Sequence, residues 1–207
     1  MRDIHCFSFV EDEPSSAVLR KLVTVQNARR EDIRIVFRPG FPKVLGGFGQ
    51  LKVRTRSLLE MGRGNLFTLT DLDKGECAPT LIRDWFLLTP GQPIDLPTAL
   101  WFRVAVREVE AWLMADREAL ARYLGISPTN IPRDPDDLGD PKQELLNAIR
   151  RKGCKNWHKD MLPRGSAHVG PQYNERICDF VNSAWVPARA AGNSPSLKRA
   201  IESLSRL

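Results

Sequence analysis

The stretch Asn65-Leu66-Phe67-Thr68-Leu69-Thr70-Asp71-Leu72-Asp73-Lys74-Gly75 decides the fold, because an apolar run stops there abruptly on two carboxylates. Residues 66–70 carry apolar side chains at alternate positions, which predicts a buried strand. Side chains two residues apart on a strand point the same way, so we expect Asp71 and Asp73 to project together from its carboxyl end. Two carboxylates at one point suit a hard divalent cation such as Mg²⁺ or Mn²⁺. The alternative is that Asp71 caps a turn or a helix and Asp73 is solvated.

An alternation of strands and helices extends outward from this strand. Patterns typical of strands also occupy residues 4–10, 33–37 and 98–106. Patterns typical of helices occupy residues 17–26, 50–61, 79–88, 107–115 and 116–124. The glycine-rich segment 40–49 is expected to be irregular. This order predicts an α/β fold with a mainly parallel, Rossmann-like sheet of about four strands and flanking helices.

Acidic residues follow three of the predicted strands. Ligands of such a sheet bind outside the carboxyl ends of its strands, so we expect these acids to converge. They are Glu11 and Glu13 after the first strand, Asp71 and Asp73 after the third, and Glu108 and Glu110 after the fourth. Because Glu108 and Glu110 diverge by about 200° on a helix, only one of them can easily face the site.

The last third of the chain differs in character. Residues 127–141 contain four prolines and several aspartates, which is typical of an irregular connection. Helices are expected over 141–152, 172–184 and 195–206, the last with Ser194 at the N-cap and Pro195 at the first helical position. These features predict an α/β core, 1–126, with a helical C-terminal extension, 127–207, packed on it. One compact domain is the alternative.

The charge of the chain favours an anionic partner. Its formal net charge is +6, and residues 33–63 contain seven basic side chains and a single acid. On a helix starting at residue 50, Lys52, Arg56 and Arg63 would fall within about 40° of one another. They are a candidate nucleic-acid-binding stripe, and the alternative is an ordinary solvated helix face. The basic segment 152–164 is a second candidate surface, where Trp157 could stack on an unpaired base.

Other classes of protein are disfavoured by the sequence. No apolar run approaches the roughly 20 residues that span a bilayer, and the first residues lack a signal-peptide layout, so we expect a cytoplasmic protein. The four cysteines form no C-x-x-C pair, so neither a disulfide framework nor a four-thiolate zinc site is indicated. The glycines at 46, 47 and 49 match no Walker or dinucleotide-binding fingerprint, so we expect no nucleotide-triphosphatase activity in this chain.

Four short motifs, spread over nearly the whole chain, carry a family resemblance. They are Val10-Glu11, Thr70-Asp71-Leu72-Asp73, Glu110-Ala111-Trp112-Leu113-Met114-Ala115-Asp116 and Ser194-Pro195-Ser196-Leu197. With a glutamate after the first strand and an Asp-x-Asp after the third, the chain resembles the Toprim domain, the metal-dependent fold of topoisomerases, primases and overcoming-lysogenization-defect (OLD) nucleases. It is most similar to the Toprim-related domain-of-unknown-function family 4276, which occurs in prokaryotic genomes and in mobile or defence loci.

The resemblance implies a Toprim-like fold and a Mg²⁺- or Mn²⁺-dependent phosphodiesterase that acts on DNA or RNA. It implies that Glu11, Asp71 and Asp73 hold the metal, and that Glu110 is a further ligand or a general base. It also implies a prokaryotic defence or mobile-element context. An ATPase partner protein encoded nearby and a homo-oligomer are both compatible with it, and no membrane partner is expected.

The first acidic loop departs from the family pattern. The family usually has a glycine and then a threonine-glutamate pair shortly after the first glutamate, whereas this chain reads Glu11-Asp12-Glu13-Pro14-Ser15. The missing glycine removes a flexible position beside the site. Glu13 could substitute as an acid. Alternatively, the chain is a catalytically inactive Toprim-like interaction subunit of a larger defence complex.

Overall fold

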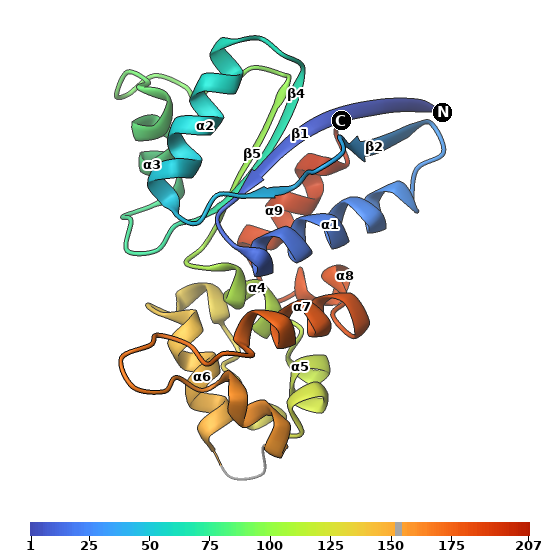
Figure 1. Ribbon diagram of the computed structural model, residues 1–207. Coiled ribbons are helices and arrows are strands. Elements are labelled where there is room, and N and C mark those ends of the chain that lie inside the picture. The colour runs from blue at the N-terminus through green and yellow to red at the C-terminus, as the bar shows by residue number, and fades with distance from the viewer. Residues whose placement is uncertain (152–154) are drawn as a thin grey trace.

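The structure is a computed structural model that describes residues 1–151 and 155–207, and its centre is a five-stranded sheet (Figure 1). The strands are β1 (Arg2–Val10), β2 (Ile33–Phe37), β3 (Lys43–Val44), β4 (Asn65–Asp71) and β5 (Leu100–Ala105). The main order is β2-β1-β4-β5, β3 pairs with the end of β1, and each of these pairs is parallel. The predicted α/β fold with a mainly parallel sheet is confirmed. Strand β3 lies in the segment predicted to be irregular, since two residues are too few to carry a periodic pattern.

The predicted helices are present, with ends shifted by a few residues. The α-helices are α1 (Glu13–Asn27), α2 (Phe48–Glu60), α3 (Ala78–Phe86), α4 (Val109–Met114), α5 (Arg117–Leu124), α6 (Pro141–Arg150), α7 (Tyr173–Ser183), α8 (Pro187–Ala190) and α9 (Pro195–Leu204). Single 3-10 turns lie at η1 (Pro128–Asn130), η2 (Pro135–Asp137) and η3 (Asn156–Met161). Helix α6 ends at Arg150, and the predicted end at Lys152 lies outside the described residues. Ser194 caps α9 as predicted, because its hydroxyl accepts a hydrogen bond from the Leu197 amide.

Helices cover both faces of the sheet. Successive side chains of a strand point to opposite faces, and here both faces carry apolar side chains that the helices bury. Phe9 of β1 belongs to an apolar cluster with α2 and α3, and Val10 belongs to a larger cluster on the opposite face with α1 and α9. This larger cluster continues into α4, α5, α6 and α7, so residues of 1–126 and of 127–207 share it. In the described parts of the chain, no helix is both long and apolar enough to cross a bilayer.

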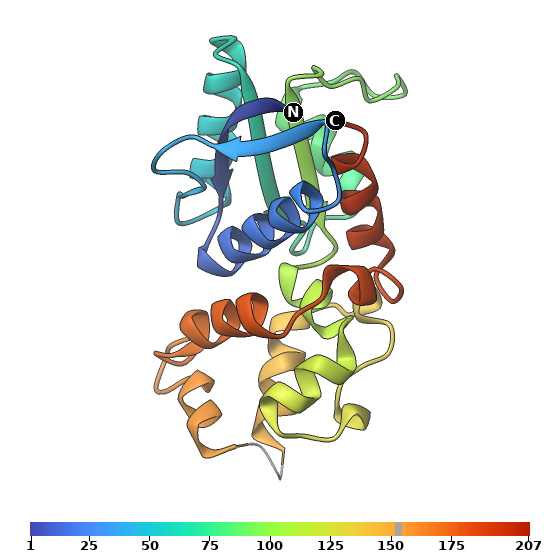
Figure 2. The ribbon, with the colours of Figure 1, turned by 90° about the vertical axis from the view of Figure 1, so that its right-hand side faces the viewer.

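Helices α4 to α8 form a layer at the carboxyl ends of the strands (Figures 1 and 2). Helix α1 packs against α7 of this layer, and α9 returns to lie beside β5. The strand ends that carry the predicted acids therefore border a layer of helices.

Candidate functional site

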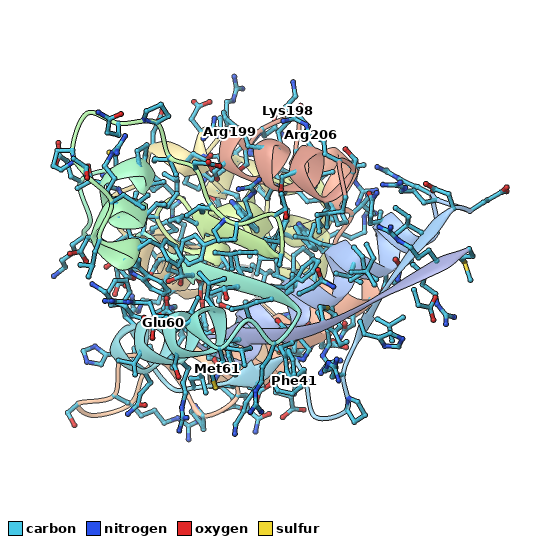
Figure 3. All side chains as sticks on the ribbon, turned by 90° about the horizontal axis from the view of Figure 1, so that it is seen from above. Phe41, Glu60, Met61, Lys198, Arg199 and Arg206 are labelled. Atoms are coloured by element: carbon cyan, nitrogen blue, oxygen red, sulfur yellow. The ribbon has the colours of Figure 1, made fainter. Side chains whose placement is uncertain are left out.

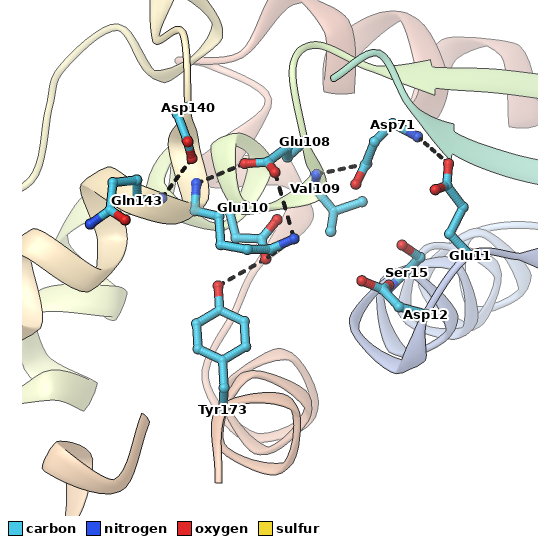
Figure 4. A network of polar contacts seen from close by, with 11 residues as sticks. Glu11, Asp12, Ser15, Asp71, Glu108, Val109, Glu110, Asp140, Gln143 and Tyr173 are labelled. Atoms are coloured by element: carbon cyan, nitrogen blue, oxygen red, sulfur yellow. Dashed lines mark hydrogen bonds and ion pairs between the residues drawn. The ribbon is translucent and has the colours of Figure 1, made fainter. Parts of the chain in front are cut away.

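Acidic side chains from three strand ends meet where the sheet borders the helical layer (Figure 4). Glu11 directly follows β1, and Asp71 is the last residue of β4. After β5 the chain reaches Glu108, the N-cap of α4, and Glu110 in the first turn of that helix. Because β1, β4 and β5 are adjacent and parallel, their carboxyl ends lie together, which is why these acids converge.

Glu11 and Asp71 are fixed by hydrogen bonds that join the two strand ends. The Glu11 Oε1 atom accepts hydrogen bonds from the Thr70 hydroxyl at 2.5 Å and from the Asp71 amide at 3.1 Å. Asp71 Oδ1 in turn accepts a hydrogen bond from the Val109 amide at 3.0 Å, which ties β4 to the start of α4. Each carboxylate thus uses one oxygen to hold the backbone. Its second oxygen has no hydrogen-bond partner among the described residues and remains available to a ligand.

Two residues from the C-terminal region, 127–207, contact the acids at the start of α4. The Lys142 ammonium lies 3.5 Å from a carboxylate oxygen of Glu108 and 3.5 Å from one of Glu110. The Tyr173 hydroxyl donates a hydrogen bond of 2.8 Å to Glu110 Oε1. Glu110 is 0% exposed, and its Oε2 atom has no hydrogen-bond partner in the described structure. A buried carboxylate oxygen without a partner is costly, so this atom would be stabilised by a cation or a donor that the protein itself does not supply.

Lys142 and Tyr173 were not among the residues predicted from the sequence. They lie 32 and 63 residues after Glu110, far from any strand-end acid in the chain. Lys142 carries one weak signal, because it is the second residue of α6, in the first turn after the N-cap Asp140. A cation is unfavourable at that end of a helix dipole, so a lysine there points to a compensating acid nearby. We find no comparable signal for Tyr173.

The acids of the site are harder to ionise than usual. Burial raises the pKa of Asp71 well above its ordinary value, and the carboxylate of Glu110 raises it further. Burial raises the pKa of Glu110 to about 7, although the Lys142 ammonium opposes the shift. Burial also raises the pKa of Glu11 and of Glu108. A carboxyl group that titrates near neutral pH can exchange protons at physiological pH, as a general acid or base must.

Lys142 shows the complementary effect. Burial by itself lowers its pKa, but the carboxylates of Glu110 and Glu108 outweigh burial and raise the pKa above the ordinary value for lysine. Asp71 contributes in the same direction. The ammonium is therefore held in its charged form by the acids around it.

Asp12, rather than Glu13, is the second acid of the first loop that acts on the site. Its carboxylate caps α1 by accepting a hydrogen bond from the Ser15 amide at 2.9 Å, and it also raises the pKa of Asp71. Glu13 is exposed, and its charge instead raises the pKa of Cys178, after the larger effect of burial. Glu13 was the candidate to substitute for the glutamate that the family usually has in this loop, but its charge affects Cys178 and not Asp71.

Asp73 lies at the exposed rim of the site. Its backbone adopts a left-handed conformation with φ of 49°, and the intervening Leu72 turns inward and is only 4% exposed. Burial raises the pKa of Asp73, while the nearby Lys142 lowers it and Asp12 raises it. Asp73 therefore shares charged neighbours with Asp71, but the turn between them takes it out of the strand on which the two were expected to project together.

The site as a whole carries excess negative charge. We call the six acids Glu11, Asp12, Asp71, Asp73, Glu108 and Glu110 the acidic cluster. Lys142 is the cation that forms ion pairs with it in the described structure. Six carboxylates minus one ammonium leave a formal charge of −5 when all groups are ionised. Such repulsion is relieved either by protonation or by a bound cation.

The donor set of the acidic cluster fits a hard divalent cation, because all of its ligand atoms are carboxylate oxygens. The buried Glu110 Oε2 atom without a partner agrees with this fit. Among residues 1–151 and 155–207, however, no three His, Cys, Asp or Glu side chains are grouped closely enough to ligate one ion. A metal would have to draw the predicted ligands Glu11, Asp71 and Asp73 together.

The predicted basic stripe is only partly on one helix. Lys52 forms an ion pair of 2.6 Å with Asp84, and Arg56 lies 4.0 Å from Glu60 on the same helix. Helix α2 ends at Glu60, so Arg63 lies beyond it and the helical spacing used to place Arg63 on the stripe does not apply. In the alternative segment, Trp157 is 37% exposed but already packs against the Arg176 guanidinium, and Lys152 lies outside the described residues.

Comparison with known proteins gave no match to a family model, a curated protein or a solved structure. The Toprim-like interpretation therefore rests on the sequence motifs. The geometry and charge of the acidic cluster are what point to a function.

Proposed function

We propose that the protein is a phosphodiesterase that uses Mg²⁺ or Mn²⁺ to cleave nucleic acid at the acidic cluster. The observation that carries this proposal is the excess of carboxylates over Lys142 at the carboxyl ends of three adjacent parallel strands. Structural acids are usually paired with cations, whereas this cluster concentrates charge that a divalent cation would neutralise.

In this proposal Glu11 and Asp71 hold the cation through their unbonded oxygens, with Asp73 at the rim as a third ligand. When bound, the metal polarises a phosphate oxygen and makes water a better nucleophile. Glu110 accepts a proton from the attacking water, a role that suits a carboxyl group whose pKa is about 7. The Tyr173 hydroxyl fixes one oxygen of Glu110, which leaves Oε2 as the base. Lys142 holds Glu108 and Glu110 in place and can attract a substrate phosphate.

Nucleic acid is the proposed substrate because the chain combines this acidic cluster with a net charge of +6. The negatively charged acidic cluster therefore belongs to a protein whose overall positive charge attracts polyanions. Arg63 is exposed beyond α2, and Lys52 and Arg56 lie on that helix, so these residues are the proposed contacts to the phosphate backbone. The defence or mobile-element context and an ATPase partner rest on the family resemblance alone.

The proposal predicts that Asp71→Asn abolishes cleavage. Loss of a metal ligand should lower Mn²⁺-dependent cleavage of DNA or RNA by at least about a hundredfold, since even residues that only support a ligand contribute about 10- to 100-fold. The matched control is Asp95→Asn, which removes an exposed acid outside the acidic cluster. Nuclease assays with Mg²⁺, Mn²⁺ or EDTA measure the effect. Metal-dependent cleavage that is equal in wild type and Asp71→Asn would overturn the proposed site.

A second candidate function is an inactive interaction subunit. It is favoured by the ion pairs of Lys142 with Glu108 and Glu110, which already supply one cation to the cluster, and by the spread of the predicted ligands. Calorimetric titration with Mn²⁺ separates the two candidates. Binding below millimolar metal that is lost in Asp71→Asn supports the phosphodiesterase, and absence of such binding supports the interaction subunit.

A further inference from the structure

A second site lies along the outer edge of β5. No other described strand pairs with this edge, since β5 is last in the order β2-β1-β4-β5. A cavity of about 640 Å³ lies against it, between α3 and α9. Its apolar wall includes Pro79, Ile82 and Val106. Its opposite wall is formed by Arg199 of α9 and by Arg206, which follows the end of that helix. Cavities of this size suit a small ligand with both an apolar and a polar part.

Arg103 of β5 lines this cavity and is held in a fixed orientation. Its Nε atom donates to the Ser203 hydroxyl at 2.6 Å, and its Nη1 atom donates to the Phe102 carbonyl at 2.8 Å. Ser203 is itself fixed, because it also accepts a hydrogen bond from Trp101 Nε1 at 2.7 Å and donates one to the Ala200 carbonyl at 2.8 Å. The guanidinium is thus preorganised, and its Nη2 group has no hydrogen-bond partner among the described residues.

The charges of this cavity are not balanced by the protein. Arg103 is half-buried and bonds only to neutral oxygens, and burial and then the charge of Arg206 lower its pKa. Arg199 and Arg206 add two more positive charges, and Glu202 is the one acid among the described residues that line the cavity. Three arginines minus one glutamate leave a formal charge of +2. A partly buried cation such as Arg103 beside the like charge of Arg206 is unfavourable until an anion joins them.

We infer that this cavity binds the phosphate and ring of a nucleoside monophosphate group. A phosphomonoester carries a charge close to −2 at neutral pH, which matches the net +2 of the cavity, whereas a single carboxylate carries −1. The Nη2 group of Arg103, which has no partner among the described residues, can donate a charge-assisted hydrogen bond to a phosphate oxygen. The apolar wall at Pro79 and Ile82 accepts the ring. This chemistry occurs in a free mononucleotide and at the phosphorylated end of a nucleic-acid strand.

Calorimetry in EDTA tests the inference without any contribution from a metal at the acidic cluster. The probes are adenosine monophosphate, adenosine, inorganic phosphate, and one oligonucleotide with either a 5′-phosphate or a 5′-hydroxyl end. Adenosine monophosphate should bind at least about tenfold more tightly than adenosine and than inorganic phosphate. Preference for the free nucleotide identifies a small ligand, and preference for the 5′-phosphorylated strand identifies a strand end. Equal binding of adenosine monophosphate and adenosine, or no binding of any phosphomonoester, would overturn the inference.

The variant Arg199→Gln/Arg206→Gln tests the location. Both side chains are exposed, Arg199 on α9 and Arg206 just beyond its end, so the fold should be retained, which circular dichroism can verify (Figure 3). Phosphomonoester binding should weaken about ten- to a hundredfold, because charge-assisted contacts are lost. The matched control is Lys198→Gln, which removes an exposed cation of the same helix that does not line the cavity. An equal loss in the control would mean general electrostatic attraction and would contradict a defined site.

Discussion

The acidic cluster at the strand ends and the arginine cavity beside β5 both gather like charges, but they differ in how the protein treats them. The acidic cluster has Lys142 as an internal counter-ion and a fully buried carboxylate, Glu110, at its centre. The arginine cavity has no carboxylate bonded to Arg103 in the described structure, and Arg199 and Arg206 are exposed to water. Removal of one cation should therefore cost considerable stability in the acidic cluster and little in the arginine cavity.

The largest expected effect is that of Lys142→Met on the acidic cluster. Removing one partner of a mostly buried ion pair costs about 3 kcal/mol, because the other charge is left unpaired. Lys142 is 28% exposed and pairs with the 0% exposed Glu110, so we expect a loss of about that size in the free energy of unfolding at pH 8. Urea unfolding measures it.

The matched control is Lys198→Met, which removes an exposed lysine of α9 and should change stability by less than about 0.5 kcal/mol. The double variant Lys142→Met/Glu110→Gln should recover part of the loss, because it also removes the buried charge. Equal stability of Lys142→Met and Lys198→Met would show that the ammonium does not balance the acidic cluster.

The sequence predicts those parts of the two regions that follow from local patterns, and misses the contacts between residues far apart along the chain. Glu11 and Asp71 were predictable, because each follows an apolar run and parallel strands place their carboxyl ends together. Lys142 and Tyr173 were not, because they reach Glu110 through the packing of α6 and α7, which no local pattern encodes. The prediction that Arg63 lies on the helix was wrong for a simpler reason, because α2 ends at Glu60.

The arginine cavity was not predicted at all. Arg103 lies in a strand and looks like an ordinary alternating polar residue. Its partner Ser203 is 100 residues further along the chain and reaches β5 only because α9 returns to the sheet. The order of strands and helices thus predicts which strand ends meet. The contacts of α9, which returns to pack beside β5, are seen only in the structure.

The second prediction concerns Glu110→Gln and pH. The pKa of Glu110 is raised by burial from 4.5 to about 7, so its folded-state contribution is fully present below about pH 4.5 and is lost as the pH rises through about 7. Glu110→Gln removes the cost of ionising a buried acid, which is about 1.4 kcal/mol per pKa unit, and the pKa of about 7 already includes the opposing effect of Lys142. We therefore expect the variant to be more stable than wild type by about 1–2 kcal/mol at pH 8 and equal to it near pH 4.5. Unfolding curves at both pH values measure this.

Asp95→Asn is the control for this pH dependence, since Asp95 is exposed and lies outside the acidic cluster. It should show the same stability as wild type at both pH values. If Glu110→Gln were less stable than wild type at pH 8, the Lys142 ion pair would outweigh the cost of burying the charge, and the acidic cluster would be balanced rather than overcharged.

The smallest expected effect is that of Arg103→Met, which makes the same kind of change as Lys142→Met in the opposite region. Arg103 loses hydrogen bonds to Ser203 and to the Phe102 carbonyl, but Ser203 keeps its bonds to Trp101 and Ala200. The lost bonds are offset by removal of a half-buried cation that lies beside Arg206. We expect the free energy of unfolding to change by less than about 1 kcal/mol.

Arg103→Met should nevertheless remove a dependence on anions. A ligand that binds only the folded state stabilises it by RT ln(1 + [L]/Kd), so adenosine monophosphate should raise the melting temperature of the wild type in EDTA and leave that of Arg103→Met nearly unchanged. Lys198→Met, which leaves the arginine cavity intact, should respond as wild type does. A large destabilisation of Arg103→Met without ligand would mean that Arg103 serves the packing of α9 on β5 rather than an anion, and the two regions would then differ only in the sign of their charge.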